Sequence, residues 1–76
     1  METTLSSLKI GKQAVITHLG CSGLLRRRII DMGLTPGAWV TVLHRAPLGD
    51  PLEIRVRGYE LSIRRAEADT IIVISE

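Results

Sequence analysis

A helix-stopping segment in the first half of the chain constrains the fold more than any other part of the sequence. Gly33 follows a stretch with helical periodicity, and glycine readily adopts the left-handed backbone conformation that ends a helix. Leu34 can then fold back onto Ile29, and Pro36 prevents the helix from continuing. Pro36 and Gly37 are typical of the central positions of a type II turn. We therefore predict structural roles for Gly33, Pro36 and Gly37, which together deliver one helix onto a β-sheet at a fixed angle.

The length and composition of the chain are those of one small domain. Its 76 residues are too few for two hydrophobic cores, and a hydrophobic content of 45% with only 3% aromatic residues favours a compact aliphatic core. We expect a single domain over residues 1–76, ordered from about residue 5 to residue 74. One cysteine excludes an internal disulfide, and the first residues lack the apolar run of a signal peptide or membrane segment. The expected location is therefore the cytoplasm, without direct insertion into a membrane.

Segments rich in β-branched residues predict five strands and one helix. The strands are expected at residues 13–19, 38–45, 52–57, 59–64 and 70–74. The helix is expected at residues 23–32 with Ser22 as its N-cap, and a single helical turn at residues 65–69. Gly58 is expected to turn the hairpin between the third and fourth strands. Five short strands in so small a domain favour a closed or nearly closed barrel, because an open aliphatic sheet would expose aggregation-prone edges.

Alternating hydrophobicity divides the residues of most of these strands between two faces. In the second strand Val40 and Val42 lie on one face, and Trp39 lies on the other face and is expected to pack against the barrel or the helix. Residues 13–19 do not alternate clearly enough to say which face is buried. In the last strand Ile72 and Ile74 point away from the inward face, and this apolar surface would allow self-association.

The outward face of the predicted helix is the first candidate for a binding surface. Arg26, Arg27 and Ile30 lie opposite the core-facing stripe of the helix. Arginines in the first half of a helix oppose its macrodipole, so helix stability does not explain them. A run of charges is most often a solvated face, whereas an apolar residue rimmed by charge is typical of a contact surface. Both interpretations stay open, and we assign these three residues to a predicted partner-binding set.

A rigid loop supplies the second candidate surface. Pro47, Leu48, Gly49 and Asp50 belong to a segment with two prolines around a Gly-Asp turn signal. The segment is either only a stiff connection or a means of presenting Leu48 outward for recognition. We favour recognition and add these four residues to the partner-binding set.

No motif for catalysis, nucleotide binding or a metal centre is evident in the sequence. The segment 20–23 lacks the length and the lysine of a phosphate-binding loop. Cys21, His18 and His44 are the candidate soft or borderline metal ligands, but their spacing is not that of a known metal site. We interpret them as turn and surface residues. The prediction is therefore no enzymatic activity, no cofactor and no bound metal.

The charge pattern gives weak support for nucleic-acid binding. A net charge of +2 is small for that function, and one tryptophan, one tyrosine and no phenylalanine leave little to stack on bases. We predict no nucleic-acid partner. The arginine clusters, at residues 26–28 and again at Arg55, Arg57, Arg64 and Arg65, keep nucleic-acid binding as an alternative function.

Several spaced motifs resemble the ferrous iron transport protein A (FeoA) family. They are residues 25–37, Val40-Thr41-Val42, residues 46–51, Gly58 and residues 64–68, and the resemblance covers residues 5–73. It implies an SH3-like barrel with one helix between the first two strands, in a small bacterial cytoplasmic accessory protein. The implied partner is the cytoplasmic side of FeoB, a membrane ferrous iron transporter with a GTP-binding domain. A metal-binding regulatory module is a further alternative to this function.

Overall fold

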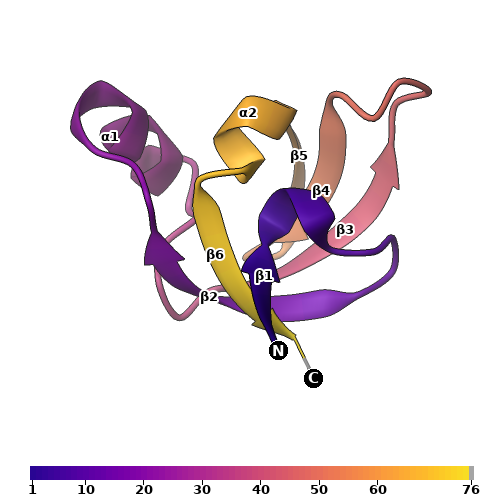
Figure 1. Ribbon diagram of the computed structural model, residues 1–76, viewed down its shortest axis with the longest axis horizontal. Helices are drawn as coiled ribbons and strands as arrows, with labels where there is room; N and C mark the ends of the chain where they lie inside the picture. The colour runs from indigo at the N-terminus through magenta and orange to yellow at the C-terminus, as the bar shows by residue number, and fades with distance from the viewer. Residues whose placement is uncertain (76) are drawn as a thin grey trace.

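Six antiparallel strands form one curved sheet, with the helix α1 at one side of it (Figure 1). The computed structural model describes residues 1–75, and within them the strand order across the sheet is β1-β6-β2-β3-β4-β5. The strands are β1 (Glu2–Thr4), β2 (Gln13–Leu19), β3 (Trp39–Arg45), β4 (Leu52–Val56), β5 (Tyr59–Ile63) and β6 (Ile71–Ser75). The helices are α1 (Gly23–Asp31), α2 (Arg65–Ala68) and the 3₁₀-helix η1 (Leu5–Ser7).

The prediction of a closed or nearly closed barrel of five strands is wrong in strand number, and the sheet does not close. A sixth strand, β1, pairs with β6 in a segment that we expected to fray, and Thr3 lies opposite Val73. The sequence of β1 has no apolar alternation, so its strand conformation depends on the hydrogen-bonding edge that β6 offers. Within residues 1–75 no strand pairing joins β1 to β5, and the sheet is therefore open. The edges are blunted in another way, because β1 has three residues and β5 carries exposed polar side chains.

The inner face of the sheet and one side of α1 enclose an aliphatic core. The fully buried large side chains are Leu5, Ile16, Ile29, Leu34, Leu52, Ile54, Ile63, Ile71, Val40, Val42, Val56 and Val73. Val40 and Val42, which share one face of β3, both belong to this core. Each Å² of apolar surface that is buried stabilises the fold by about 25 cal/mol, and this cluster is therefore the main source of stability.

The face of β2 that the sequence left undecided is set by an irregularity in its pairing with β6. Ala14 and Ile16 are buried, but the next buried residue is Leu19, because the register shifts between Ile16 and His18. An extra residue at this point exposes two consecutive side chains, Thr17 and His18. The alternation in the sequence is unclear because its phase changes within the strand.

Trp39 lies on the outer face of the sheet, on the side of β3 opposite Val40 and Val42. Its side chain is 51% exposed. Val15 lies directly opposite both Trp39 on β3 and Ile74 on β6, so the three residues form a row across neighbouring strands. Val40, the next residue of β3, takes the inward position. Because successive side chains of a strand point to opposite faces, Trp39 must lie on the outer face of β3.

The end of α1 is fixed by a hydrogen-bonded cap. The amide of Gly33 donates to the carbonyl oxygen of Ile30 at 2.9 Å, and that of Leu34 donates to the carbonyl oxygen of Ile29 at 3.2 Å. These are the two bonds of a Schellman motif, which requires the positive φ of +90° at Gly33. Leu34 is fully buried after folding back. Ser22 occupies the N-cap position, where its side chain forms no cap hydrogen bond.

A turn then ties the end of the helix to the sheet. The amide of Ala38 donates to the carbonyl oxygen of Thr35 at 3.0 Å across the Pro36-Gly37 turn, in which Gly37 has φ +93°. The amide of Gly37 also donates to the carbonyl oxygen of Ile16 in β2, at 2.7 Å. The position of α1 relative to the sheet therefore depends on backbone contacts on both sides of the turn.

The hairpin of β4 and β5 holds the same helix end from the other side. Arg57, next to Gly58 in the two-residue turn of the hairpin, donates from Nε to the carbonyl oxygen of Gly33 at 3.1 Å. Its Nη2 donates to Oγ1 of Thr35 at 2.7 Å, and the Tyr59 hydroxyl donates to the carbonyl oxygen of Met32. Two of these three donors satisfy carbonyl groups at the helix end, and the third donates to a hydroxyl oxygen. The outward face of α1 is consequently presented from a rigid base.

Candidate partner-binding surface

The two predicted binding segments lie along one edge of the molecule. In Figure 1, α1 is at the upper left, the loop between β3 and β4 is at the upper right, and α2 lies between them. We call α1, residues 46–51 and residues 62–67 together the helix-loop edge. The structure thus places helix and loop at the two ends of one surface but does not bring them into contact in that view.

The helix end of this edge contains charged residues around a partly apolar hollow. Arg26 and Arg27 are exposed, as expected, but Ile30 is half-buried and packs against the core cluster. The expectation of a fully outward Ile30 is corrected in this respect, because α1 packs Leu25 and Ile30, as well as the buried Ile29, against the core. The hollow is shallow and is lined by Gly23, Leu24, Arg26, Arg27, Ile30 and Asp31. Ile30 forms part of the lining, and the arginines still frame it.

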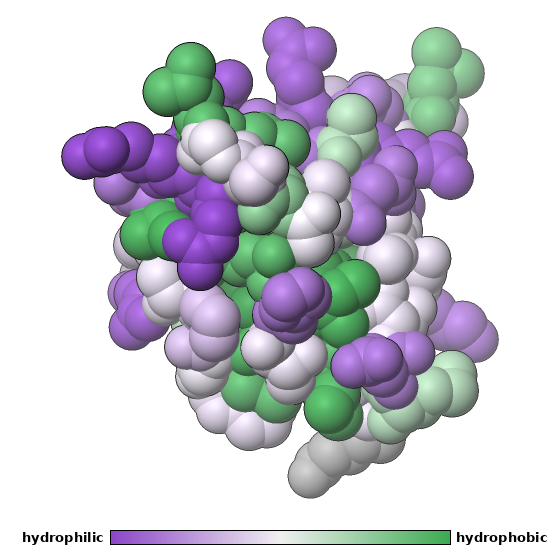
Figure 2. Space-filling model, turned by 60° about the vertical axis from the view of Figure 1, so that its left-hand side comes forward, coloured by the Kyte–Doolittle hydropathy of each residue, from purple (hydrophilic) through white to green (hydrophobic). Residues whose placement is uncertain are grey.

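Leu24 is a candidate binding residue that the sequence interpretation missed. Its side chain is 87% exposed. The residues three, four and seven positions further along the helix are Arg27, Arg28 and Asp31, which share its face. A leucine within a charged stripe of a helix is therefore the signal that could have identified it. Figure 2, with the helix side forward, shows hydrophobic side chains separated by hydrophilic ones rather than one continuous apolar area.

The loop end of the edge presents one leucine from a braced turn. Leu48 is 93% exposed. The amide of Gly49 donates to the carbonyl oxygen of Ala46 at 2.7 Å, and Asp50 Oδ1 accepts a hydrogen bond from the backbone amide of Arg65 at 3.1 Å. The loop is thereby attached to the first turn of α2. Pro47, Leu48 and Asp50 are exposed, whereas Gly49 is half-buried.

A polar hollow of about 420 Å³ lies between these two ends. Arg28 from α1, Asp50 from the loop, Ser62 and Arg64 from the end of β5, and Glu67 from α2 contribute to its lining. Glu67 is 7% exposed and is the buried charged residue of the core region. Its Oε1 accepts a hydrogen bond from the amide of Arg64 at 3.1 Å, and its Oε2 lies 3.6 Å from Nε of Arg28. This ion pair connects the two helices across the hollow.

Most arginines of the edge have no carboxylate partner. Two ion pairs between side chains occur in residues 1–75, Arg28 with Glu67 and Arg55 with Glu60. The four arginines of the edge other than Arg28 are in neither pair: Arg26, Arg27, Arg64 and Arg65. Their guanidinium groups are available to an external ligand.

The residues considered as metal ligands do not form a cluster. In the described part of the chain, no three His, Cys, Asp or Glu side chains come together in a way that could hold a metal ion. His18 and His44 are exposed on β2 and β3, and Cys21 is half-buried against the core. Absence of a bound metal stays a prediction for titration experiments. Every helix in residues 1–75 is too short or too polar to span a membrane.

Comparison with solved structures places the chain among small SH3-like β-domains. FeoA of Stenotrophomonas maltophilia, described as a procaryotic SH3 domain protein complexed with zinc, is 26% identical, with a TM-score of 0.82 over 95% of this chain and 89% of that one. FeoA of Chlorobium tepidum is 44% identical, with a TM-score of 0.85 over 95% of this chain and 70% of that one. The SH3-like character predicted for the fold is therefore confirmed.

The sequence comparisons give the family. Residues 3–75 match the model of the FeoA domain, and the chain belongs to the FeoA family. A curated relative, the Fe(2+) transport protein A/Fe(2+) transporter FeoB fusion protein of Porphyromonas gingivalis, is 44% identical over 69 residues. This match covers 91% of the present chain and 8% of that protein. In the relative, a FeoA region and a FeoB transporter are thus parts of one polypeptide.

Proposed function

We propose that this chain is an accessory protein of ferrous iron uptake that binds a FeoB-type transporter on its cytoplasmic side. The observation that carries the proposal is the Porphyromonas gingivalis relative, in which the FeoA and FeoB regions share one chain. A fusion holds two domains at a high effective concentration, which is useful when the two domains act on each other. The same contact between separate chains requires a surface with its own affinity. The proposed role is binding, without catalysis or a cofactor.

The helix-loop edge is the proposed contact surface. Leu24 and Leu48 are 87% and 93% exposed, the first on α1, which packs against the core, and the second on the loop that is hydrogen-bonded to α2. Exposed apolar residues surrounded by charged ones are typical of protein interfaces, in which a few anchors carry most of the binding energy. Arg26 and Arg27 beside Leu24 would orient the partner and accelerate its association. Bound in this way, the domain would modulate the transporter by favouring one of its conformational states.

A binding titration with the cytoplasmic portion of a FeoB-type transporter tests this proposal. We expect Leu24→Asp and Leu48→Asp each to weaken binding by about 2 kcal/mol or more, roughly thirtyfold in Kd. Arg27→Glu is expected to reduce the association rate and to weaken the salt dependence of that rate. The dissociation rate should change less. Ile10→Asp, which alters an exposed apolar residue in the segment between η1 and β2, is the matched control. No binding by the parent chain would overturn the proposal, and equal binding by all variants would remove the proposed surface.

The alternative functions predict other results. Nucleic-acid binding through the arginines predicts a gel shift that weakens steeply between low and moderate salt. A metal-binding regulatory module predicts stoichiometric Fe(II) or Zn(II) binding that is lost in Cys21→Ser or His18→Ala. We expect neither result, and either one would replace the proposed function by the corresponding alternative.

A further inference from the structure

The polar hollow in the middle of the helix-loop edge contains an arginine, Arg28, that is held in place but keeps hydrogen-bond donors without a partner. Nε of Arg28 lies 3.6 Å from Oε2 of Glu67, which is longer than a typical charge-assisted hydrogen bond. The side chain of Glu67 is 10% exposed, whereas that of Arg28 is 66% exposed. Among residues 1–75 no hydrogen bond engages the terminal amino groups of Arg28. The buried carboxylate thus positions a guanidinium whose outer donors remain free.

The opposite wall of the hollow adds a second arginine from a fixed backbone. The amide of Arg64 donates to Oε1 of Glu67, and the amide of the next residue, Arg65, donates to Oδ1 of Asp50. Both carboxylates of the hollow are therefore engaged with protein groups. The exposed side chain of Arg64 lines the hollow and has no ion pair in residues 1–75. The guanidinium groups of Arg28 and Arg64, one on each wall, are therefore available to the same ligand.

The formal charge of the molecule is concentrated at this edge. The helix-loop edge contains five arginines, at positions 26, 27, 28, 64 and 65, and three carboxylates, at positions 31, 50 and 67. Its formal charge of +2 equals that of the whole chain, so the basic and acidic residues elsewhere cancel. A ligand attracted by charge is consequently directed to this edge and not to the rest of the surface.

We infer that the hollow binds an acidic peptide segment of the protein partner, whose carboxylates pair with Arg28 and Arg64. Arginine pairs carboxylates through parallel N–H donors, and free donors of this kind face the hollow from two elements. A peptide also brings backbone N–H groups, which can donate to the second carboxylate oxygen of the exposed Asp50, the one that does not accept from Arg65. A phosphodiester backbone has no N–H groups to donate to this oxygen atom. The inference rests on the proposed function only for the identity of the protein that carries the segment.

A titration observed by NMR tests the inference in the isolated chain. The probe is an oligoglutamate peptide blocked at both ends, added to the full chain labelled with ¹⁵N. We expect saturable shifts of the Arg28 Nε–H signal and of the amides of Ser62 and Arg64, with a Kd on the order of 1 mM. The double variant Arg28→Gln/Arg64→Gln is expected to lose about tenfold in affinity. Arg64→Gln alone, which leaves the Arg28–Glu67 pair in place, should lose part of this affinity even if the double variant is unstable.

A control of equal charge separates specific from general attraction. Lys9→Gln/Lys12→Gln also removes two positive charges, but from exposed positions outside the edge. We expect this variant to keep nearly the parent affinity. Equal losses in the two double variants, or shifts spread over all basic residues, would overturn the inference. Tighter binding of an oligothymidylate at the same residues would also overturn it in favour of nucleic acid. If the transporter binds the parent and Arg28→Gln/Arg64→Gln equally well, the acidic-segment inference fails and the proposed function stands. If the transporter binds neither protein, the proposed function fails, whatever the result with the peptide.

Discussion

The helix-loop edge and the outer face of the sheet both expose apolar residues, but the two regions are built differently. On the outer face, Trp39, Val15 and Ile74 lie opposite one another on three neighbouring strands. On the edge, Leu24 and Leu48 stand alone on separate elements and are almost fully exposed. A row of cross-strand partners contributes to the stability of the sheet, whereas an isolated exposed leucine contributes little to the fold. Residues that the fold does not need are the better markers of function.

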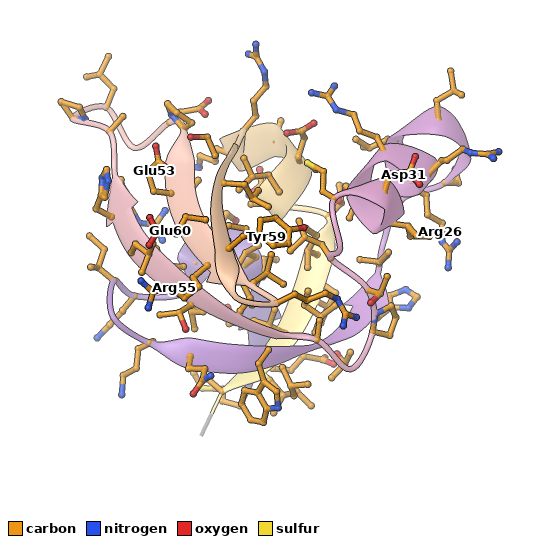
Figure 3. The ribbon with its side chains drawn as sticks, turned by 180° about the vertical axis from the view of Figure 1, so that it is seen from behind. Arg26, Asp31, Glu53, Arg55, Tyr59 and Glu60 are labelled. Atoms are coloured by element: carbon orange, nitrogen blue, oxygen red, sulfur yellow. The ribbon has the colours of Figure 1, made fainter. Side chains whose placement is uncertain are left out.

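The charged residues of the two regions differ in the same way. Nη2 of Arg55 on β4 lies 2.9 Å from Oε2 of Glu60 on β5, and the two residues are directly opposite in the hairpin. Figure 3 shows this pair on the sheet, away from α1, where the labelled Arg26 projects from the helix. Arg26 and Arg27 have no such partner within residues 1–75. The hairpin pairs Arg55 with a carboxylate, whereas Arg26 and Arg27 on the helix-loop edge are left available to a partner.

The largest expected effect distinguishes the two sides of α1. Ile29→Ala removes a fully buried side chain that anchors the helix, and we expect a loss of about 2–5 kcal/mol in the free energy of unfolding. Leu24→Ala, on the outward side, should change the free energy of unfolding by less than about 0.5 kcal/mol. Urea titrations of both variants provide the measurement. A large loss for Leu24→Ala would show that this residue is structural and would break the comparison.

The next effect tests how α1 is positioned on the sheet. In Gly33→Ala the new Cβ would lie 2.7 Å from the Tyr59 hydroxyl and would require positive φ, for which we expect a cost of about 1–3 kcal/mol. Gly11→Ala is the matched control, because Gly11 also has positive φ but a Cβ there meets no atom within 4 Å. The difference between the two variants measures the clash at the helix end. Equal destabilisation would indicate that backbone strain alone accounts for the cost.

A smaller effect is expected on the outer face of the sheet. Trp39→Ser should lower the free energy of unfolding by about 0.2–1 kcal/mol, because it removes one cross-strand partner of Val15. Binding to the transporter should stay at the parent level, in contrast to Leu24→Asp. Self-association through the outward apolar surface of β6 stays a prediction, and sedimentation of the parent and Trp39→Ser would test it. Loss of transporter binding in this variant would move the interface to the sheet.

The smallest expected effect concerns the ion pair of the hairpin. Arg55→Gln should cost no more than about 1 kcal/mol, since both partners are more than half exposed and salt screens them. The effect should shrink further when thermal unfolding is repeated at high salt. Arg64→Gln, at an arginine without an ion pair, serves as the comparison and should have almost no effect on stability. A larger loss in Arg64→Gln would mean that the free charges of the edge are structural.

Much of the fold could be predicted from residue types along the chain, and the candidate site only in part. The predicted helix and the five predicted strands all occur, with bounds that differ by at most one residue at either end. Arg26, Arg27 and Leu48 are exposed as expected, but Leu24 and the Arg28–Glu67 pair were missed. Three of the six strands, β3, β4 and β5, lie between Arg28 and Glu67 in the sequence, so no local pattern could indicate that the two residues meet. Whether the predicted residues bind a partner is a question for the titrations.

The sequence by itself determined the local features of this protein. The end of α1 at Gly33, the turn at Pro36 and Gly37, and the alternation of β3 and β4 follow from backbone preferences and side-chain periodicity, which act between near neighbours. The tertiary structure decided that β1 joins the sheet, that β2 changes phase after Ile16, and that helix and loop flank one polar hollow. These features depend on hydrogen bonds and contacts between residues far apart in the chain, which exist only after the sheet has formed.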